Sequence, residues 1–99
     1  MLPILFHSEA AIEASIAADW YEHQQPGLGQ RFENDLQTTA RHVQVNPLIY
    51  AAEKHDERTA ALRHFPYSVI FKVYHDRIWV SCVSHHKRRP GYWRKRNPD

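Results

Sequence analysis

The sequence has 99 residues, of which 42% are hydrophobic and 12% aromatic, so we expect one small folded domain and not a disordered chain. No apolar run approaches the roughly 18 residues of a membrane-spanning helix, and the apolar start MLPILF lacks the preceding basic residues of a signal peptide. We therefore expect a cytoplasmic protein without a membrane partner. The single cysteine, Cys82, excludes an internal disulfide bond.

Charge is distributed unevenly along the chain, although the net charge is only +2. Residues 1–86 hold 7 Lys and Arg against 10 Asp and Glu, whereas residues 87–99 hold 6 Lys and Arg against the single acidic residue Asp99. A positive field concentrated at one end of a chain indicates an anionic partner for that end.

The chain is predicted to begin with a strand and a helix. Residues 2–6 form a short apolar run with a proline near its start, which is typical of the first strand of a sheet. Ser8 can cap the helix that follows. Three apolar residues recur at intervals of four along this helix: Ile12, Ile16 and Trp20. This stripe is predicted to face the core, and the helix is predicted to end near Gln24, ahead of Pro26 and Gly27.

A second helix is predicted from about residue 28 to residue 45. It opens from the compact turn Pro26-Gly27-Leu28-Gly29, and Asn46-Pro47 ends it. Its apolar positions lie three or four residues apart: Phe32, Leu36, Ala40 and Val43. Two helices joined by so short a turn must lie roughly antiparallel, and at these lengths they need a sheet against which to bury their apolar stripes.

The second half of the chain is predicted to consist mainly of strands. Residues 67–74 and 78–83 are rich in β-branched and aromatic side chains and form a hairpin around a turn at His75-Asp76. Residues 59–62 could pair beside this hairpin, and residues 48–52 could form a further short strand.

The hairpin has one apolar face, which is predicted to take the helices: Val69, Phe71, Val73, Ile78, Val80 and Cys82. Trp20 and Trp79 are predicted to be core residues from their spacing. The expected fold is therefore α+β, with a helical hairpin packed on one face of a small antiparallel, meandering sheet of three to five strands.

The hairpin leads directly into a basic, aromatic segment that carries the candidate binding residues: His85, His86, Lys87, Arg88, Arg89, Tyr92 and Trp93. Arginine forks match the geometry of phosphate, and aromatic faces stack on unpaired bases. The basic residues could equally form a solvated tail or a dock for an acidic partner, and Trp93 could fold back onto the sheet as a core anchor. We expect one domain over residues 1–93, followed by a basic tail at residues 94–99 that could be disordered.

Three sequence motifs in this order resemble the RelE/ParE superfamily, the toxins of type II toxin–antitoxin modules, which include plasmid-stabilisation modules. They are PGLGQRF at the second helix, FPYSVIFKVY in the penultimate strand and HHKRRPGYW at the end. The likeness runs from Leu5 to Trp93. It implies a RelE/ParE-like fold, no cofactor, and a small toxin that a neighbouring gene's antitoxin neutralises. Some members cleave mRNA on the ribosome and others inhibit DNA gyrase, so the implied target is the ribosome with its mRNA or DNA gyrase.

For a ribonuclease, the resemblance implies His85 as base or acid, Arg88 and Arg89 as phosphate clamps, and Tyr92 as a further catalytic or stacking residue. Cleavage by a ribose 2′-hydroxyl needs a proton acceptor, cations for the phosphate and a proton donor. The residues expected to bind the target are Arg63, Lys87, Arg88, Arg89 and Trp93.

The chain departs from the ribonuclease pattern at positions where that branch carries cations. Thr59-Ala60-Ala61 stands where ribonuclease members have basic residues, and Ser68 stands where they have an arginine. These departures favour a gyrase-type or unassigned toxin, or a ribonuclease whose active site is arranged differently. Between the two targets they favour gyrase inhibition slightly over mRNA cleavage.

Two classes of function other than a toxin are a zinc protein and a non-catalytic nucleic-acid-binding module. A zinc protein is not expected, because the 8 histidines are scattered and one cysteine completes no standard ligand spacing. A non-catalytic nucleic-acid-binding module is an open alternative, since a basic tail with Tyr92 and Trp93 could grip a single strand unaided.

Overall fold

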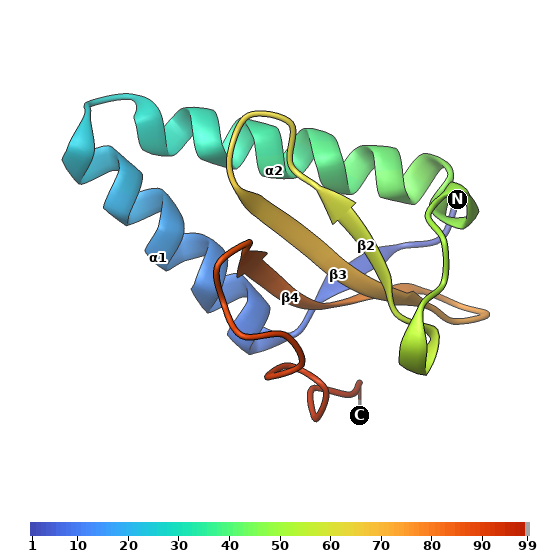
Figure 1. Ribbon diagram of the computed structural model, residues 1–99. Coiled ribbons are helices and arrows are strands. Elements are labelled where there is room, and N and C mark those ends of the chain that lie inside the picture. The colour runs from blue at the N-terminus through green and yellow to red at the C-terminus, as the bar shows by residue number, and fades with distance from the viewer. Residues whose placement is uncertain (99) are drawn as a thin grey trace.

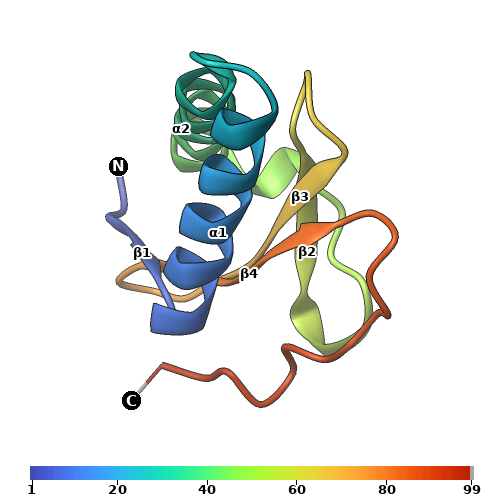
Figure 2. The same cartoon turned by 90° about the vertical axis from the view of Figure 1, so that its left-hand side faces the viewer.

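Two helices and a four-stranded sheet form two layers in the structure, a computed structural model that describes residues 1–98 (Figure 1). The elements follow one another along the chain as β1 (Ile4–Phe6), α1 (Ser8–Gln24), α2 (Leu28–Val45), β2 (Arg58–Ala61), β3 (Tyr67–Val73) and β4 (Ile78–His85). Both helices lie on the same side of the sheet (Figure 2). The predicted α+β fold with a helical hairpin on one face is confirmed. Among residues 1–98, no helix is both long and apolar enough to cross a membrane.

The strands lie in the order β1-β4-β3-β2. β3 pairs antiparallel with β2 and with β4, so the predicted hairpin and the strand beside it are both present. β1 pairs parallel with β4, from Ile4 opposite Ile78 to Phe6 opposite Val80, which makes the sheet mixed and not purely antiparallel. A parallel pair needs a long connection, and here the helices and two strands lie between β1 and β4 along the chain.

The helical hairpin depends on two glycines and one carboxylate. Gly27 has a φ of +89°, a conformation that residues with a side chain rarely adopt, and it begins the turn into α2. At Gly29 the helices are so close that a Cβ atom would lie 2.6 Å from the backbone oxygen of Ala18. Glu22 at the end of α1 accepts the N–H groups of Gly27 and Gly29 at 2.9 and 3.0 Å, which satisfies free donors at the start of α2. This explains the PGLG motif physically.

The core lies between the helices and the sheet. Its largest fully buried side chains there are Phe32, Val43, Val69, Phe71, Ile78, Val80 and Val83. The aromatic rings of Tyr21, Phe65 and Tyr67 pack around Phe32 with centroid distances of 5.5, 5.3 and 5.1 Å. α2 buries the face that its spacing predicted.

The prediction that Ile12, Ile16 and Trp20 face the core is wrong. These side chains are 49%, 63% and 58% exposed. The buried residues of α1 are its alanines: Ala10, Ala17 and Ala18. Small side chains let the backbone of α1 approach α2 and the sheet closely, so the large apolar residues are left on the outer face.

A β-bulge between β3 and β4 changes which side chains face the helices. Ile70 lies opposite Cys82, but the next residue along β3 lies opposite Val80, which leaves Ser81 as the extra residue. Because side chains alternate along a strand, the insertion places Cys82 on the face away from the helices and Val83 in the helix-facing core. The prediction that Cys82 shares the face of Val80 is therefore wrong.

Trp79 is partly buried and belongs to neither apolar cluster, so its predicted place in the core is also wrong. Its indole N–H donates to the backbone oxygen of Arg96 at 2.9 Å, and its ring meets that of His7 edge to face. Trp79 thus holds the end of the chain against β4, an inner strand of the sheet.

Two local predictions near the turns are wrong. Residues 48–52 form no strand, because the chain enters the 3-10 turn Pro47–Ile49, whose proline has no N–H to donate to a sheet. The residue that caps α1 is His7 and not Ser8. The Nδ1 atom of His7 accepts the N–H of Glu9 at 2.9 Å.

Candidate target-binding site

After β4 the chain turns back across the face of the sheet that the helices leave open (Figure 2). We call residues 86–98 the C-terminal arm. Trp93 is its main anchor: the side chain is 8% exposed and packs against Ile70 and Cys82. Its indole N–H donates to a carboxylate oxygen of Glu57 at 2.6 Å. The sequence left two roles open for Trp93, and the structure shows it as a core anchor. The predicted tail at residues 94–99 follows Trp93, and residue 99 lies outside the described residues.

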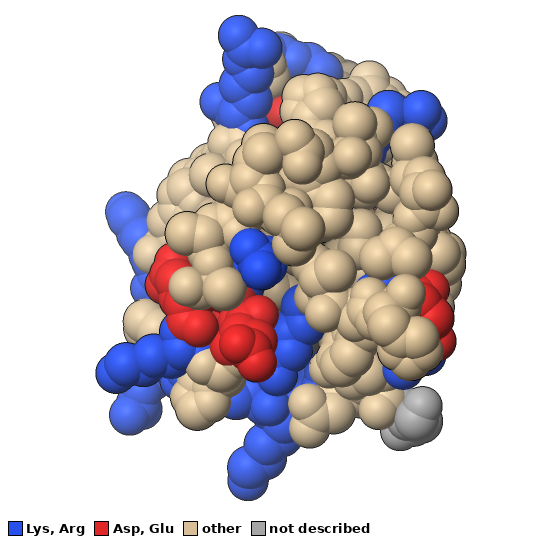
Figure 3. All heavy atoms as spheres, turned by 90° about the vertical axis from the view of Figure 1, so that its right-hand side faces the viewer, with Lys and Arg blue, Asp and Glu red and all other residues tan. Residues whose placement is uncertain are grey.

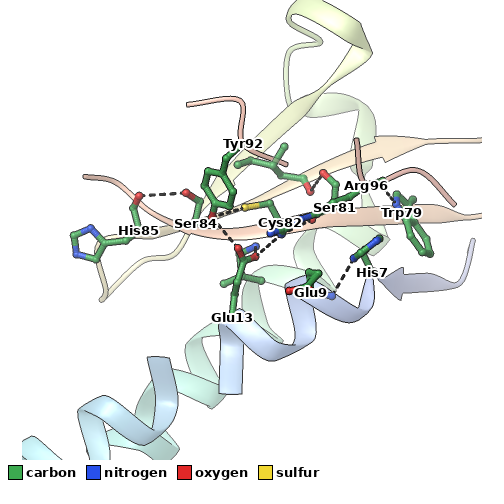
Figure 4. A network of polar contacts seen from close by, with 12 residues as sticks. His7, Glu9, Glu13, Trp79, Ser81, Cys82, Ser84, His85, Tyr92 and Arg96 are labelled. Carbon is green, nitrogen blue, oxygen red and sulfur yellow. Dashed lines mark hydrogen bonds and ion pairs between the residues drawn. The ribbon is translucent and has the colours of Figure 1, made fainter. Parts of the chain in front are cut away.

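Tyr92 is held by polar contacts on both the helix and the sheet (Figure 4). Its hydroxyl donates to Glu13 Oε2 at 2.9 Å and lies 3.0 Å from Cys82 Sγ. The guanidinium of Arg88 lies over its ring, 4.2 Å from the centroid. Burial, together with the contact to Cys82, raises the pKa of Tyr92, and burial raises the pKa of Cys82 to about 12. Neither group is prepared to release a proton near neutral pH.

His85 ends β4 with one ring nitrogen already engaged. Its Nδ1 accepts the backbone N–H of Lys87 at 3.0 Å, so the neutral ring carries its proton on Nε2. The ring also packs edge to face on Tyr67, with centroids 5.0 Å apart. The neighbouring His86 places Nε2 2.9 Å from the hydroxyl of Ser68. Both histidines therefore stabilise the turn that starts the arm.

The basic residues of the arm divide into paired and unpaired groups. Arg96 forms an ion pair with Glu13 at 2.9 Å, and Arg94 lies 3.7 Å from Glu57. Burial alone would lower the pKa of Arg96, but the hydrogen bond and the charge of Glu13 outweigh it and raise the pKa. The remaining four are exposed and make no ion pair within residues 1–98: Lys87, Arg88, Arg89 and Lys95. We call the three that directly follow β4, Lys87, Arg88 and Arg89, the basic cluster.

Lys and Arg side chains project from the lower end of the molecule, where they flank a smaller acidic group (Figure 3). On the open face of the sheet, a hollow of about 400 Å³ lies beside the start of the arm. It is lined by residues of the sheet and the arm, which include Thr59, Ser68, His85, His86, Arg88 and Trp93. The cations of this lining are Arg88 and Arg94 from the arm and Lys54 from the turn before β2. The carboxylates of Glu53 and Glu57 also line the hollow, and the sheet contributes hydroxyl groups.

Arg63 does not join the residues of the arm. It is exposed in the loop between β2 and β3, and it lines a separate hollow of about 430 Å³ beside α2. Its backbone N–H donates to the buried carboxylate of Asp35 at 3.3 Å, and the N–H of His64 donates to the same carboxylate at 2.8 Å. Asp35 thus fixes the loop, and Arg63 is at a distinct surface from the basic cluster.

The model of a protein family matches residues 4–90 of this chain: the ParE toxin of type II toxin–antitoxin systems, parDE. The chain belongs to the ParE toxin family. The resemblance to the RelE/ParE superfamily is confirmed, and a parDE system implies a cognate ParD antitoxin as partner.

The ParE fold is also found among solved structures. A chain from a structure described as the chromosomal ParDE TA system from P. aeruginosa superposes with a TM-score of 0.76. The two sequences are 20% identical, and the likeness covers 86% of this chain and 96% of that chain. None of the curated proteins matches this sequence.

The match to the ParE family ends at residue 90, whereas several residues that fasten the arm come after it. Tyr92, Trp93 and Arg96 lie in this final stretch. Their two acidic partners, Glu13 and Glu57, were not identified from the sequence. No local pattern distinguishes these carboxylates from the other acidic residues, because their partners lie 36 to 83 positions away.

Among residues 1–98, no three His, Cys, Asp or Glu side chains are grouped so that they could hold a metal ion.

Proposed function

We propose that this ParE-family toxin arrests growth by binding and inhibiting DNA gyrase through its basic cluster, without cleaving RNA. The observation that carries the proposal is a difference between two groups of side chains at the end of β4 and in the C-terminal arm. His85 and Tyr92, which have acid–base chemistry, are engaged in structural contacts. Lys87, Arg88 and Arg89 are exposed and without ion pairs within residues 1–98.

Cleavage of RNA would need a free proton acceptor and a proton donor close to the phosphate. The hydroxyl of Tyr92 is bound to Glu13 and Cys82, and its raised pKa makes it a weak acid. The Nδ1 atom of His85 is occupied by the N–H of Lys87. The adjoining hollow offers hydroxyl groups at Thr59 and Ser68, where ribonucleases of the superfamily carry cations. These features favour a toxin that acts by binding.

The direct test measures supercoiling by purified gyrase in the presence of the toxin. We expect inhibition by the wild type and none by the double variant Arg88→Ala with Arg89→Ala, which should melt at the temperature of the wild type. The matched control is Arg31→Ala with Arg41→Ala, which removes the same charge from exposed positions on α2 and should inhibit as the wild type does.

The same proteins should also be added to a translating extract and to labelled single-stranded RNA. Cleaved mRNA in the extract, with gyrase unaffected, would replace the proposal with the ribonuclease alternative. Uncleaved RNA that the toxin binds with a steep dependence on salt, again with gyrase unaffected, would instead indicate a nucleic-acid-binding module.

We further propose that the antitoxin covers the exposed apolar stripe of α1, formed by Ile12, Ile16 and Trp20. Exposed apolar stripes at helical spacing are typical docking surfaces for an amphipathic helix. Ile16 lines a hollow of about 200 Å³ together with Arg88 and Tyr92. An acidic helix seated on the stripe would therefore reach the basic cluster and block the target-binding surface.

A further inference from the structure

One carboxylate on α1 connects three segments that are far apart in the sequence (Figure 4). Glu13 accepts the backbone N–H of Val83 at 3.1 Å, the hydroxyl of Tyr92 at 2.9 Å and an Nη1 hydrogen of Arg96 at 2.9 Å. Its side chain is only 16% exposed. Because both carboxylate oxygens are in use, Glu13 ties the middle of the arm to the first helix and to β4.

The contact between Glu13 and Tyr92 also affects Arg88 of the basic cluster. The ring of Tyr92 lies beneath the guanidinium of Arg88 at 4.2 Å, and no ion pair within residues 1–98 holds Arg88 elsewhere. An arginine stacked on an aromatic face keeps its N–H edge free for an acidic partner. The direction in which Arg88 points is therefore set by Tyr92, and the position of Tyr92 is set by Glu13.

The ion pair between Glu13 and Arg96 leaves the charge of Arg88 free for an acidic partner. The negative charge of Glu13 is directed at Arg96, whose guanidinium it contacts at 2.9 Å. Arg96 also lies against the ring of Tyr92, 5.2 Å from the centroid, and donates to the backbone oxygen of Ser81 at 3.2 Å. Arg96 is thus a structural cation, and Glu13 holds the arm without neutralising the exposed arginine above the ring.

We propose that Glu13 is a positioning residue of the toxin: acting through Tyr92, it orients Arg88 for the target without touching the target itself. This inference rests on the proposed role of the basic cluster in binding. It assigns part of the toxic activity to a residue of α1 that contacts the arm at Tyr92 and Arg96 but lies outside the basic cluster.

The test is a double-mutant cycle between Glu13 and Arg88. Glu13→Gln keeps the shape of the side chain but removes its charge, and Arg88→Lys keeps a charge but loses the flat guanidinium that stacks on Tyr92. With Arg88 present, we expect Glu13→Gln to weaken toxicity about tenfold, the effect typical of losing a hydrogen bond to a charged group. In the Arg88→Lys background the same change should cost no more than about twofold.

Tyr92→Phe gives a second double-mutant cycle with Arg88, since it keeps the ring and removes only the hydroxyl. Its effect on toxicity should depend on Arg88 in the same way, and this second cycle is sufficient as a test if Glu13→Gln does not fold. Glu9→Gln is the matched control, because Glu9 lies one turn earlier on α1, is exposed, and should leave toxicity unchanged. Thermal unfolding of each variant separates loss of toxicity from loss of the fold.

Toxicity is measured as growth arrest at graded induction, in parallel with gyrase inhibition. Equal losses from Glu13→Gln and Tyr92→Phe in the two Arg88 backgrounds would overturn the inference, because a merely structural role gives additive effects. A wild type that arrests growth but leaves gyrase active would refute the gyrase proposal alone. In that case the growth-arrest cycle still decides the role of Glu13.

Discussion

Replacing Trp93 with Phe should release the C-terminal arm from the sheet. The Trp93 side chain is 8% exposed, packs against Ile70 and Cys82, and donates its indole N–H to Glu57 at 2.6 Å. Glu57 is itself only 7% exposed. Its other charged contact is Arg94, whose side chain is 44% exposed and lies 3.7 Å away, so this long contact does not replace the buried donor. A phenyl ring fills part of the space but leaves the Glu57 carboxylate without its buried donor.

The loss can be worked out from these contacts. A hydrogen bond to a charged group is worth about 1.5–3 kcal/mol, and the smaller ring removes roughly 1 kcal/mol of packing. We expect the free energy of unfolding to fall by about 2.5–4 kcal/mol. In a domain of this size each kcal/mol lowers the melting temperature by about 4–8 °C, so the expected decrease is at least about 10 °C.

Thermal unfolding by circular dichroism measures the effect on stability, and limited trypsin digestion measures release of the C-terminal arm. Trp20→Phe is the matched control, because Trp20 is 58% exposed and the substitution should change stability by less than about 0.5 kcal/mol. If Trp93→Phe melted within about 2 °C of the control and its arm resisted trypsin equally, the anchoring role of Trp93 would be refuted.

Three further predictions follow from the packing and the titrating groups. Gly29→Ala should lower the free energy of unfolding, measured in urea, by about 1–3 kcal/mol, because its Cβ atom would lie 2.6 Å from the backbone oxygen of Ala18. In the control Gly27→Ala the Cβ atom has open space, and only backbone strain of about 1 kcal/mol is expected. Equal effects of the two substitutions would contradict the close contact between the helices. Ile16→Lys should leave the melting temperature unchanged but weaken antitoxin binding in calorimetry at least about tenfold, and unchanged affinity would exclude the stripe as the docking surface. The folded state holds the protons of Cys82 and Tyr92 more tightly than the unfolded chain does, since the pKa of each is raised from its ordinary value of 9.0 or 10.0. Stability in urea should therefore be constant up to about pH 9 and fall as the pH rises further, and Cys82→Ala should delay the onset to about pH 10; an unchanged onset would refute this account of Cys82.

Local sequence signals predicted the backbone elements well. The bounds of α2 were predicted at residues 28 and 45, because the turn before it and Asn46-Pro47 after it act within a few residues. The hairpin of β3 and β4 followed from its β-branched and aromatic composition. The three motifs likewise led to the RelE/ParE superfamily, and the match to the ParE toxin family confirms it.

The faces of these elements were harder to predict. On α1 the large apolar residues suggested a core stripe, but the structure buries Ala10, Ala17 and Ala18 instead, and the helices are closest where Ala18 meets Gly29. The extra residue Ser81 places Cys82 on the face of the sheet away from the helices, and no local sequence pattern predicts this bulge. Spacing alone therefore does not show which face of a helix or strand is buried.

The candidate site was predicted only in part for a similar reason. The exposed cations of the arm were recognised, because charge is a property of each residue: Lys87, Arg88 and Arg89. Their supporting carboxylates, Glu13 and Glu57, were not recognised, because a buried partner is defined by its neighbours in space. Arg63 was grouped with the arm by its charge, although the fold places it at a different hollow.

By itself, the sequence determined the element order, the hairpins and the family, because propensity, capping and turn chemistry act over a few neighbouring residues. Only the tertiary structure decided that Ile16 stays exposed, that Trp93 is buried, and that Glu13 holds Tyr92 beneath Arg88. These outcomes depend on contacts between segments as many as 83 positions apart, as for Glu13 and Arg96. The chain must fold before such groups can meet.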